Sequence, residues 1–69
     1  MGAVHKIIDL VGTSTESVDD AIRGAIAEAS RTLHGLEWFE VKEMRGGIGE
    51  GKVTQFQVVL RVGFKLDRS

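Results

Sequence analysis

The first hydrophobic stretch of the chain runs from Val4 to Val11 and is rich in β-branched residues. This composition is typical of a strand, and the glycine that follows, Gly12, is a common strand terminator. We therefore predict a first strand that stops at Gly12.

The next apolar residues recur at helical spacing instead of alternating. Steps of four, three, four and four residues join Val18, Ile22, Ala25, Ala29 and Leu33 into one stripe. This period is typical of an amphipathic helix. Ser17 and Asp20 fit a capping box at its start, and Gly35 fits a left-handed residue after its end. The pattern predicts a helix from about Ser17 to His34, with His34 interacting with the helix dipole.

Alternation returns after the helix and predicts a second strand over residues 38–45. Phe39 and Val41 fall on one face of this strand, and Trp38 falls on the other. The glycine-rich segment 46–51 then interrupts the alternation. We predict that this segment is a hairpin connection.

A long third strand is predicted over residues 52–66. Its even-numbered positions from residue 56 onward are all apolar: Phe56, Val58, Leu60, Val62, Phe64 and Leu66. Its odd-numbered positions are mostly polar, so one face of the strand is expected to pack against the helix and the other is not.

The order strand, helix, strand, strand predicts an α+β fold of the βαββ type, as a single domain spanning residues 1–69. A right-handed crossover makes the first two strands parallel in direction, and the hairpin reverses the third. Placing the third strand in the middle gives an antiparallel sheet of order 1-3-2 with the helix on one face. The other face, which carries Trp38, is expected to be covered by another subunit or by a flat ligand.

Composition narrows the possible partners. A chain of 69 residues buries only about 60% of the surface that its unfolded form exposes, which favours self-association. The formal charge of −1 argues against a nucleic-acid partner, because binding the phosphate backbone requires a basic surface. No apolar run reaches the roughly 20 residues of a membrane span, and the N-terminus lacks a signal-peptide pattern. We therefore expect a cytoplasmic protein without a membrane partner.

The residues that commonly carry catalysis or bind metals do not form a recognisable pattern. The chain has no cysteine and only two histidines, His5 and His34, so no metal site is predicted. Strand parity places Glu40 and Glu43 on opposite faces, which does not suit two carboxylates acting on one bond. No helix follows the glycine-rich segment, as a phosphate-binding loop would require. We predict no catalytic residues and no enzymatic activity.

Trp38 and Gln57 are the most informative residues. A lone tryptophan in a small domain usually belongs to the core, but Phe39 and Val41 already occupy the helix side of the second strand. Parity places Gln57 on the same outer face, as an amide with donors and acceptors beside a potential stacking platform. A planar heteroaromatic molecule with amide-like edges would satisfy both side chains.

Around these two residues the sequence resembles bacterial dodecins, a family of small flavin-binding proteins. Three segments at family spacing carry the resemblance: LVGTS at residues 10–14, LEWFEVKEMRG at 36–46 and FQVVLRVGFKL at 56–66. The resemblance implies a hollow homododecamer of βαββ subunits with tetrahedral symmetry. It also implies that flavins are held in pairs on two-fold axes.

The resemblance assigns roles to four residues. Trp38 would stack on the flavin ring, so that two tryptophans sandwich two flavins, and Gln57 would hydrogen-bond the polar pyrimidine edge. Arg45 would help to hold the ligand. Lys65 would suit the phosphate of the ribityl chain or of coenzyme A. His5 stands where relatives commonly carry an aromatic residue.

The function implied is flavin storage and photoprotection, with flavin mononucleotide (FMN) as the expected cofactor and riboflavin or another flavin as the alternative. Contact with an electron-rich indole quenches an excited flavin without any acid or base. A small flavin-dependent reductase is one alternative function. A coenzyme A-binding or purely structural assembly module is another.

Overall fold

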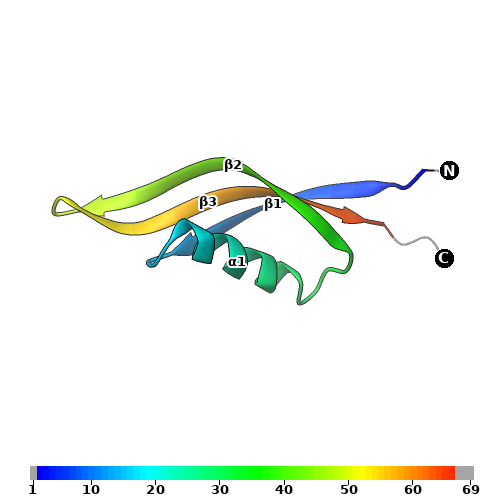
Figure 1. The fold of residues 1–69 in the computed structure, drawn as a ribbon, viewed down its shortest axis with the longest axis horizontal. Helices are drawn as coiled ribbons and strands as arrows, with labels where there is room; N and C mark the ends of the chain where they lie inside the picture. The colour runs from blue at the N-terminus through cyan, green and yellow to red at the C-terminus, as the bar shows by residue number, and fades with distance from the viewer. Residues whose placement is uncertain (1, 67–69) are drawn as a thin grey trace.

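The computed structural model of the protein describes residues 2–66. Within this range the elements are β1 (His5–Ser14), α1 (Val18–Ala29), β2 (Leu36–Gly49) and β3 (Lys52–Lys65). The strands form one sheet of order β1-β3-β2, in which β3 is antiparallel to both neighbours. Figure 1 shows α1 lying along one face of this sheet. The α+β class, the βαββ order and the central third strand are therefore confirmed.

The core lies between α1 and β3. Its buried apolar side chains come from these two elements: Ala21, Ala29, Val58, Leu60, Val62 and Phe64. Half-buried apolar residues of β1, α1 and the start of β2 pack around them: Ile8, Leu10, Val18, Ile22, Ala25, Ile26 and Leu36. The even-numbered side of β3 thus faces the helix, as its alternation predicted.

The sheet is long for so small a chain. The structure measures 54 × 20 × 13 Å and has a Cα radius of gyration of 14.5 Å, whereas a compact domain of this length has one of about 11 Å. The β2–β3 hairpin extends well beyond α1 (Figure 1). On this hairpin Met44, Ile48 and Val53 are 61%, 81% and 62% exposed. Apolar exposure on this scale is typical of a surface that packs against another molecule.

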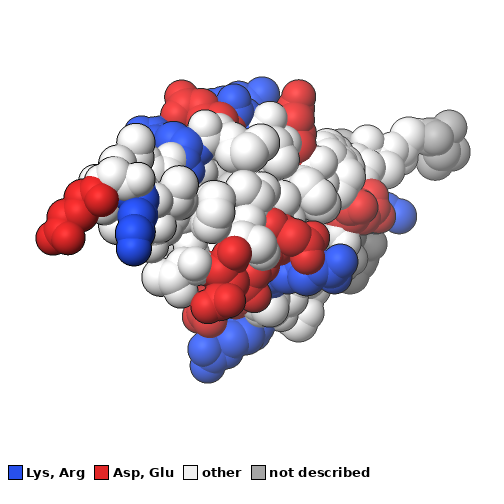
Figure 2. Space-filling view, turned by 60° about the vertical axis from the view of Figure 1, so that its left-hand side comes forward, with Lys and Arg blue, Asp and Glu red and all other residues white. Residues whose placement is uncertain are grey.

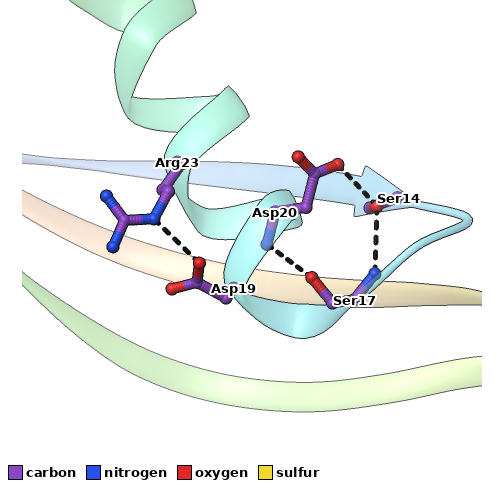
Figure 3. A network of polar contacts seen from close by, with 5 residues as sticks. All are labelled: Ser14, Ser17, Asp19, Asp20 and Arg23. Atoms are coloured by element: carbon purple, nitrogen blue, oxygen red, sulfur yellow. Dashed lines mark hydrogen bonds and ion pairs between the residues drawn. The ribbon is translucent and has the colours of Figure 1, made fainter.

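Ser17 caps α1 as predicted, but the capping box is only half formed. Ser17 Oγ accepts a hydrogen bond from the Asp20 amide at 2.9 Å. The Asp20 carboxylate accepts instead from Ser14 Oγ at 2.7 Å, and Ser14 Oγ accepts from the Ser17 amide at 3.3 Å (Figure 3). The buried Ser14 hydroxyl therefore links the end of β1 to the first turn of α1.

The helix ends at Ala29 and not near His34. The three residues after Ala29 form a turn, and the Leu33 amide donates to the Ala29 carbonyl at 3.0 Å. Beyond Ala29 the predicted stripe contained only Leu33, and one apolar residue fits a turn as well as a helix. The last turn of α1 contains no basic residue, so the predicted interaction of His34 with the helix dipole is wrong. Gly35 does have a positive φ of 77°, but it lies in the connection to β2.

The first strand also runs further than predicted, through Gly12 to Ser14. Gly12 pairs with Val58 in the middle of the sheet. A Cβ at this position would fall 2.3 Å from the carbonyl oxygen of Ala21. The glycine therefore marks the close approach of α1 to β1, and it does not end the strand.

Most of the glycine-rich segment 46–51 is strand, contrary to the predicted connection. β2 continues to Gly49, and only Glu50 and Gly51 separate it from β3. Both have positive φ, 53° and 77°, as a two-residue hairpin turn requires. Glycines earlier in the segment allow close contact between the strands, since a Cβ at Gly46 would fall 2.6 Å from the carbonyl oxygen of Gln55.

Candidate functional site

The sheet face opposite α1, called the outer face below, carries all four predicted binding residues. Gln57 and Lys65 belong to the odd-numbered side of β3, which points away from the buried even-numbered side. Directly opposed residues in neighbouring strands share a face. Trp38 opposes Gly63 and Arg45 opposes Gln57, so Trp38 and Arg45 also lie on the outer face.

Trp38 lies flat against the backbone of the central strand. A Cβ at Gly63 would fall 2.2 Å from Trp38 Cζ2 and 2.3 Å from Cη2, so only glycine leaves room for the ring. Trp38 nevertheless remains 43% exposed. The indole is therefore fixed on one side by β3 and open on the other, as a stacking platform requires.

The indole crosses β3 and meets His5, which lies on β1. The centroids of the two rings are 5.2 Å apart and their planes are inclined by 56°. His5 Nε2 also lies 2.7 Å from Glu37 Oε1. Three side chains from the two outer strands thus form one cluster, and sequence reasoning found neither of the contacts that hold it together.

Two β-bulges determine which residues of β2 face outward. The register with β3 shifts between Leu36 and Trp38 and again between Val41 and Glu43, so that Glu37 and Lys42 have no direct partner. A bulge changes the alternation of all later residues in the strand.

The second bulge, at Lys42, changes the face of the sheet on which the later residues of β2 lie. Glu40 opposes Arg61 and Glu43 opposes Val59, so both carboxylates lie on the outer face and not on opposite faces as parity predicted. The same shift brings Arg45 onto the face of Trp38. Uninterrupted alternation would have placed Arg45 toward α1.

Gln57 lies between two neighbours at the other end of the outer face. Its direct partners are Thr13 of β1 and Arg45 of β2. The Arg45 guanidinium donates a hydrogen bond to the Glu43 carboxylate, and both side chains are more than half exposed. Arg45 and Gln57 therefore present an exposed cation and an amide side by side.

The platform and the amide lie far apart within one chain. Gly63, beneath Trp38, is six residues along β3 from Gln57, which corresponds to about 20 Å along a strand. Gln57 is therefore not beside Trp38 in the same chain, contrary to the sequence-based expectation. Lys65 is only two residues beyond Gly63, so it shares the Trp38 end of the face.

A group of charged residues occupies the middle of the outer face. Asp9 lies 3.9 Å from Arg61 Nε and 4.0 Å from Lys42 Nζ. These distances are long for ion pairs, and exposed pairs of this kind contribute little to stability. Arg61 Nε is buried and has no hydrogen-bond partner among the described residues. The group separates the Trp38 end from the Gln57 end.

Surface charge, residues that could ligate a metal and helix length bear on the requirements of three other kinds of site. Figure 2 shows acidic and basic side chains side by side on the face it draws. The described part of this face has no continuous basic area of the kind that binds the phosphate backbone of a nucleic acid. Among residues 2–66, no group of three or more His, Cys, Asp or Glu side chains is placed to hold a metal ion. Over the same residues, no helix has the length and apolar character of a membrane span.

Comparison with known proteins identifies the family. The family model described as Dodecin matches residues 4–67. A curated dodecin of Thermus thermophilus is 55% identical over 69 residues, which is the whole of both chains. The chain belongs to the dodecin family.

Solved structures of similar proteins share the fold in detail. The tt0972 protein of Thermus thermophilus has a TM-score of 0.93 at 54% identity, covering 99% of this chain and all of that one. A dodecin from Streptomyces davaonensis has a TM-score of 0.92 at 48% identity, with the same coverage. A more distant relative from Mycobacterium tuberculosis, described as a calcium dodecin with a novel calcium-binding site, has a TM-score of 0.81 at 29% identity, covering 97% of this chain and 96% of that one.

Proposed function

We propose that the chain assembles into a hollow homododecamer that binds flavins in pairs. In this assembly the flavins would be stored with their excited state quenched. Membership of the dodecin family supports this proposal. The elongated shape and the uncovered apolar hairpin support self-assembly. A dodecamer with tetrahedral symmetry has two-fold axes, and the paired ligands would lie on them.

The observation that carries the proposal is the Trp38 platform. The indole is fixed against Gly63 and leaves its other side open. A flat, electron-poor ring of similar or larger size would gain stacking contacts there without reorganising the side chain. The three-ring isoalloxazine system of a flavin has these properties.

Each flavin would contact residues of two chains. Because Trp38 and Gln57 of one chain are about 20 Å apart along the sheet, a single flavin ring does not span both. The two Trp38 rings that sandwich a flavin pair would face each other across a two-fold axis, so the Gln57 that reaches each ring edge would belong to a further chain of the assembly. Trp38 of one chain would then stack on the ring while the Gln57 amide of another chain binds the pyrimidine edge.

The phosphate of FMN would be held by basic side chains at either end of the outer face. Lys65 is exposed and lies near the platform, and Arg45 lies directly opposite Gln57. Both residues are cations, so FMN is the preferred flavin in this proposal and riboflavin the weaker ligand. The same cations suit the phosphates of coenzyme A, which would be a second ligand.

The proposed role is storage and not turnover. An indole in contact with an excited flavin returns it to the ground state by transferring an electron that then moves back. The chain supplies the indole and the edge contacts, and no side chain is required to move a proton. Flavin-dependent oxidation of NADH by the purified protein would instead support the reductase alternative.

Titration of riboflavin with the purified protein tests the proposal. Free riboflavin fluoresces strongly, so we expect emission to fall to a low plateau as protein is added. The stoichiometry should approach one flavin per chain. If emission does not change at micromolar protein, flavin storage is excluded, and the coenzyme A-binding or structural role becomes the better account.

A mixed assembly tests whether each site is shared between chains. Trp38→Ala and Gln57→Leu chains are refolded together, so that some sites draw the indole and the amide from the two different kinds of chain. A site that takes its indole from a Gln57→Leu chain and its amide from a Trp38→Ala chain keeps both groups. We expect tight sites to reappear that neither variant shows alone. A mixture that binds no better than the separate variants contradicts the shared site.

A further inference from the structure

The helix side of the sheet is only partly covered by α1. The helix has 12 residues, which correspond to a length of about 18 Å. β2 has 14 residues, which correspond to about 46 Å. α1 packs on β1 and β3, and the β2–β3 hairpin continues beyond it (Figure 1). The chain's own helix therefore leaves both β2 and the far part of the hairpin uncovered on this side.

Beyond α1, the helix side of the hairpin carries three exposed apolar residues, Met44, Ile48 and Val53, called the arm below. Met44 opposes the buried Val58, and Ile48 follows Met44 at even spacing, so both point to the helix side. A register shift just before Ile48 places Val53 opposite it, so Val53 joins this face despite its odd number. Because an isolated two-stranded hairpin is only marginally stable in water, an extended apolar arm is expected to pack against another surface.

A groove runs between α1 and β2 on the same side of the sheet. Ile22 and Ile26 of α1 form one wall and Phe39 of β2 forms the other, and the cavity has a volume of about 410 Å³. Phe39 is 48% exposed. Asp19 and Arg23 lie at the rim of the same cavity. The groove therefore combines apolar walls with one acidic and one basic residue at its edge.

We propose that the arm of one chain occupies the groove of a second copy, and that three such contacts close a ring about each three-fold axis of the dodecamer. This inference rests on the proposed function, because it names surfaces that would hold the proposed assembly together. It concerns the helix side of the sheet, whereas the flavins would lie on the outer face.

The symmetry of the proposed assembly favours a second copy as the occupant. A tetrahedral dodecamer has three-fold axes as well as two-fold axes. Chains related by a three-fold axis meet through two different surfaces, and the rotation closes the ring. The arm and the groove are two different apolar surfaces of one chain. The outer face would be used at the two-fold axes, where the flavin pairs lie.

The charges at the tip of the arm complement those at the rim of the groove. The hairpin turn carries Glu50, and Lys52 begins β3; both residues are exposed. At the rim, Arg23 and Asp19 form an ion pair in which the side chains are 78% and 72% exposed. An exposed pair of this kind contributes little to stability, so its charges are free to pair with those of another chain. An acid and a base at the tip would thus meet a base and an acid at the rim.

Cross-linking tests which surfaces meet, because the chain has no cysteine of its own. The double variant Ile48→Cys/Ala27→Cys places one thiol on the arm and one on the helix wall of the groove, where Ala27 is exposed. Within one chain, Ile48 lines a cavity together with Val18 at the start of α1, and Ala27 is about 13 Å further along the helix. The assembled protein is treated with a short bismaleimide and separated on a denaturing gel.

We expect bands of two and three linked chains and none larger, since a ring of three closes on itself. Each single-cysteine variant is a control and should remain unlinked, because the ring joins unlike sites. A double variant that stays monomeric on the gel, or whose bands stop at two chains, overturns the inference. A ladder that continues beyond three chains also overturns it.

Two charge substitutions test the face of the hairpin independently. Ile48→Glu and Gln55→Glu each add one negative charge to the hairpin, but Gln55 opposes Gly47 on the outer face. Native mass spectrometry should show loss of the dodecamer in Ile48→Glu, because the carboxylate would be buried against apolar groove walls. Gln55→Glu should keep the dodecamer. A dodecamer that persists in Ile48→Glu, or that is lost equally in both variants, contradicts the proposed contact.

The outcomes distinguish this inference from the proposed function. A wild-type dodecamer that binds riboflavin, but whose double-cysteine variant gives no three-chain band, overturns the inference and leaves flavin storage intact. A wild-type protein that does not form a dodecamer overturns the proposed assembly and the inference with it.

Discussion

Trp38 lies directly on Gly63, and the two residues fit together only because Gly63 has no side chain. A Cβ at Gly63 would fall within 2.4 Å of three atoms of the indole. The platform is therefore built by a contact between the edge strand β2 and the backbone of the central strand β3. The indole owes both its fixed position and its open side to this contact.

Replacement of Gly63 by alanine should damage the platform more than the fold. The added methyl group displaces the indole, which is able to swing outward because it is 43% exposed. We expect weaker riboflavin binding, incomplete quenching, and a stability loss within the roughly 1–3 kcal/mol that is typical of overpacking. Binding is measured by fluorescence titration and stability by urea unfolding.

Gly24→Ala provides the matched control for this substitution. Gly24 lies in α1, and a Cβ there would meet nothing within 4 Å. Alanine in a helix interior is more favourable than glycine by about 0.5–1 kcal/mol, so this variant should be slightly stabilised and should bind riboflavin as the wild type does. Unchanged riboflavin binding by Gly63→Ala would show that the platform does not need the close contact.

Self-assembly should be visible directly. The exposed hairpin residues and the uncovered outer face predict that the isolated subunit is not the stable species. Native mass spectrometry at micromolar protein should show a homododecamer, and the unfolding midpoint should rise with protein concentration wherever unfolding is reversible. A monomer or a simple dimer under these conditions would contradict the proposed assembly.

Salt should distinguish the two flavins. FMN differs from riboflavin by a charged phosphate, and exposed ionic contacts are screened over a Debye length of about 8 Å at physiological ionic strength. If Arg45 and Lys65 bind the phosphate, added sodium chloride should weaken FMN binding more steeply than riboflavin binding. Equal salt dependence for the two ligands would remove both residues from phosphate recognition.

Regular periodicity made the fold predictable. The even-numbered apolar side of β3 and the helical spacing from Val18 to Ala29 each identified an element and the face it buries. The ends of the elements were less predictable, because they depend on tertiary contacts. Gly12 reads as a strand terminator in the sequence, but the close approach of Ala21 explains it in the structure. The single apolar residue Leu33 extended the predicted helix beyond its true end.

The candidate site was predictable only where alternation is uninterrupted. The outward orientation of Trp38 follows from the parity of its neighbours, and the structure places it there. The bulges at Glu37 and Lys42 have no clear signal in one sequence, yet the second of them decides the faces of Glu43 and Arg45 relative to Trp38. The contact between His5 and Glu37 depends on one of these bulges and joins β2 to β1, the strand on the far side of β3, so no local pattern reveals it.

The central claim is that Trp38 is the surface on which a flavin stacks, and the comparison of Trp38→Ala with Gln57→Leu tests it most directly. Both variants are titrated with riboflavin while flavin emission is followed. Loss of the indole should remove about 1–3 kcal/mol of stacking together with the electron donor, so the flavin that still binds should fluoresce. Loss of the amide should cost about 1–3 kcal/mol by leaving a polar edge unpaired, while the bound flavin stays dark. Tight binding with full quenching by Trp38→Ala would contradict the account.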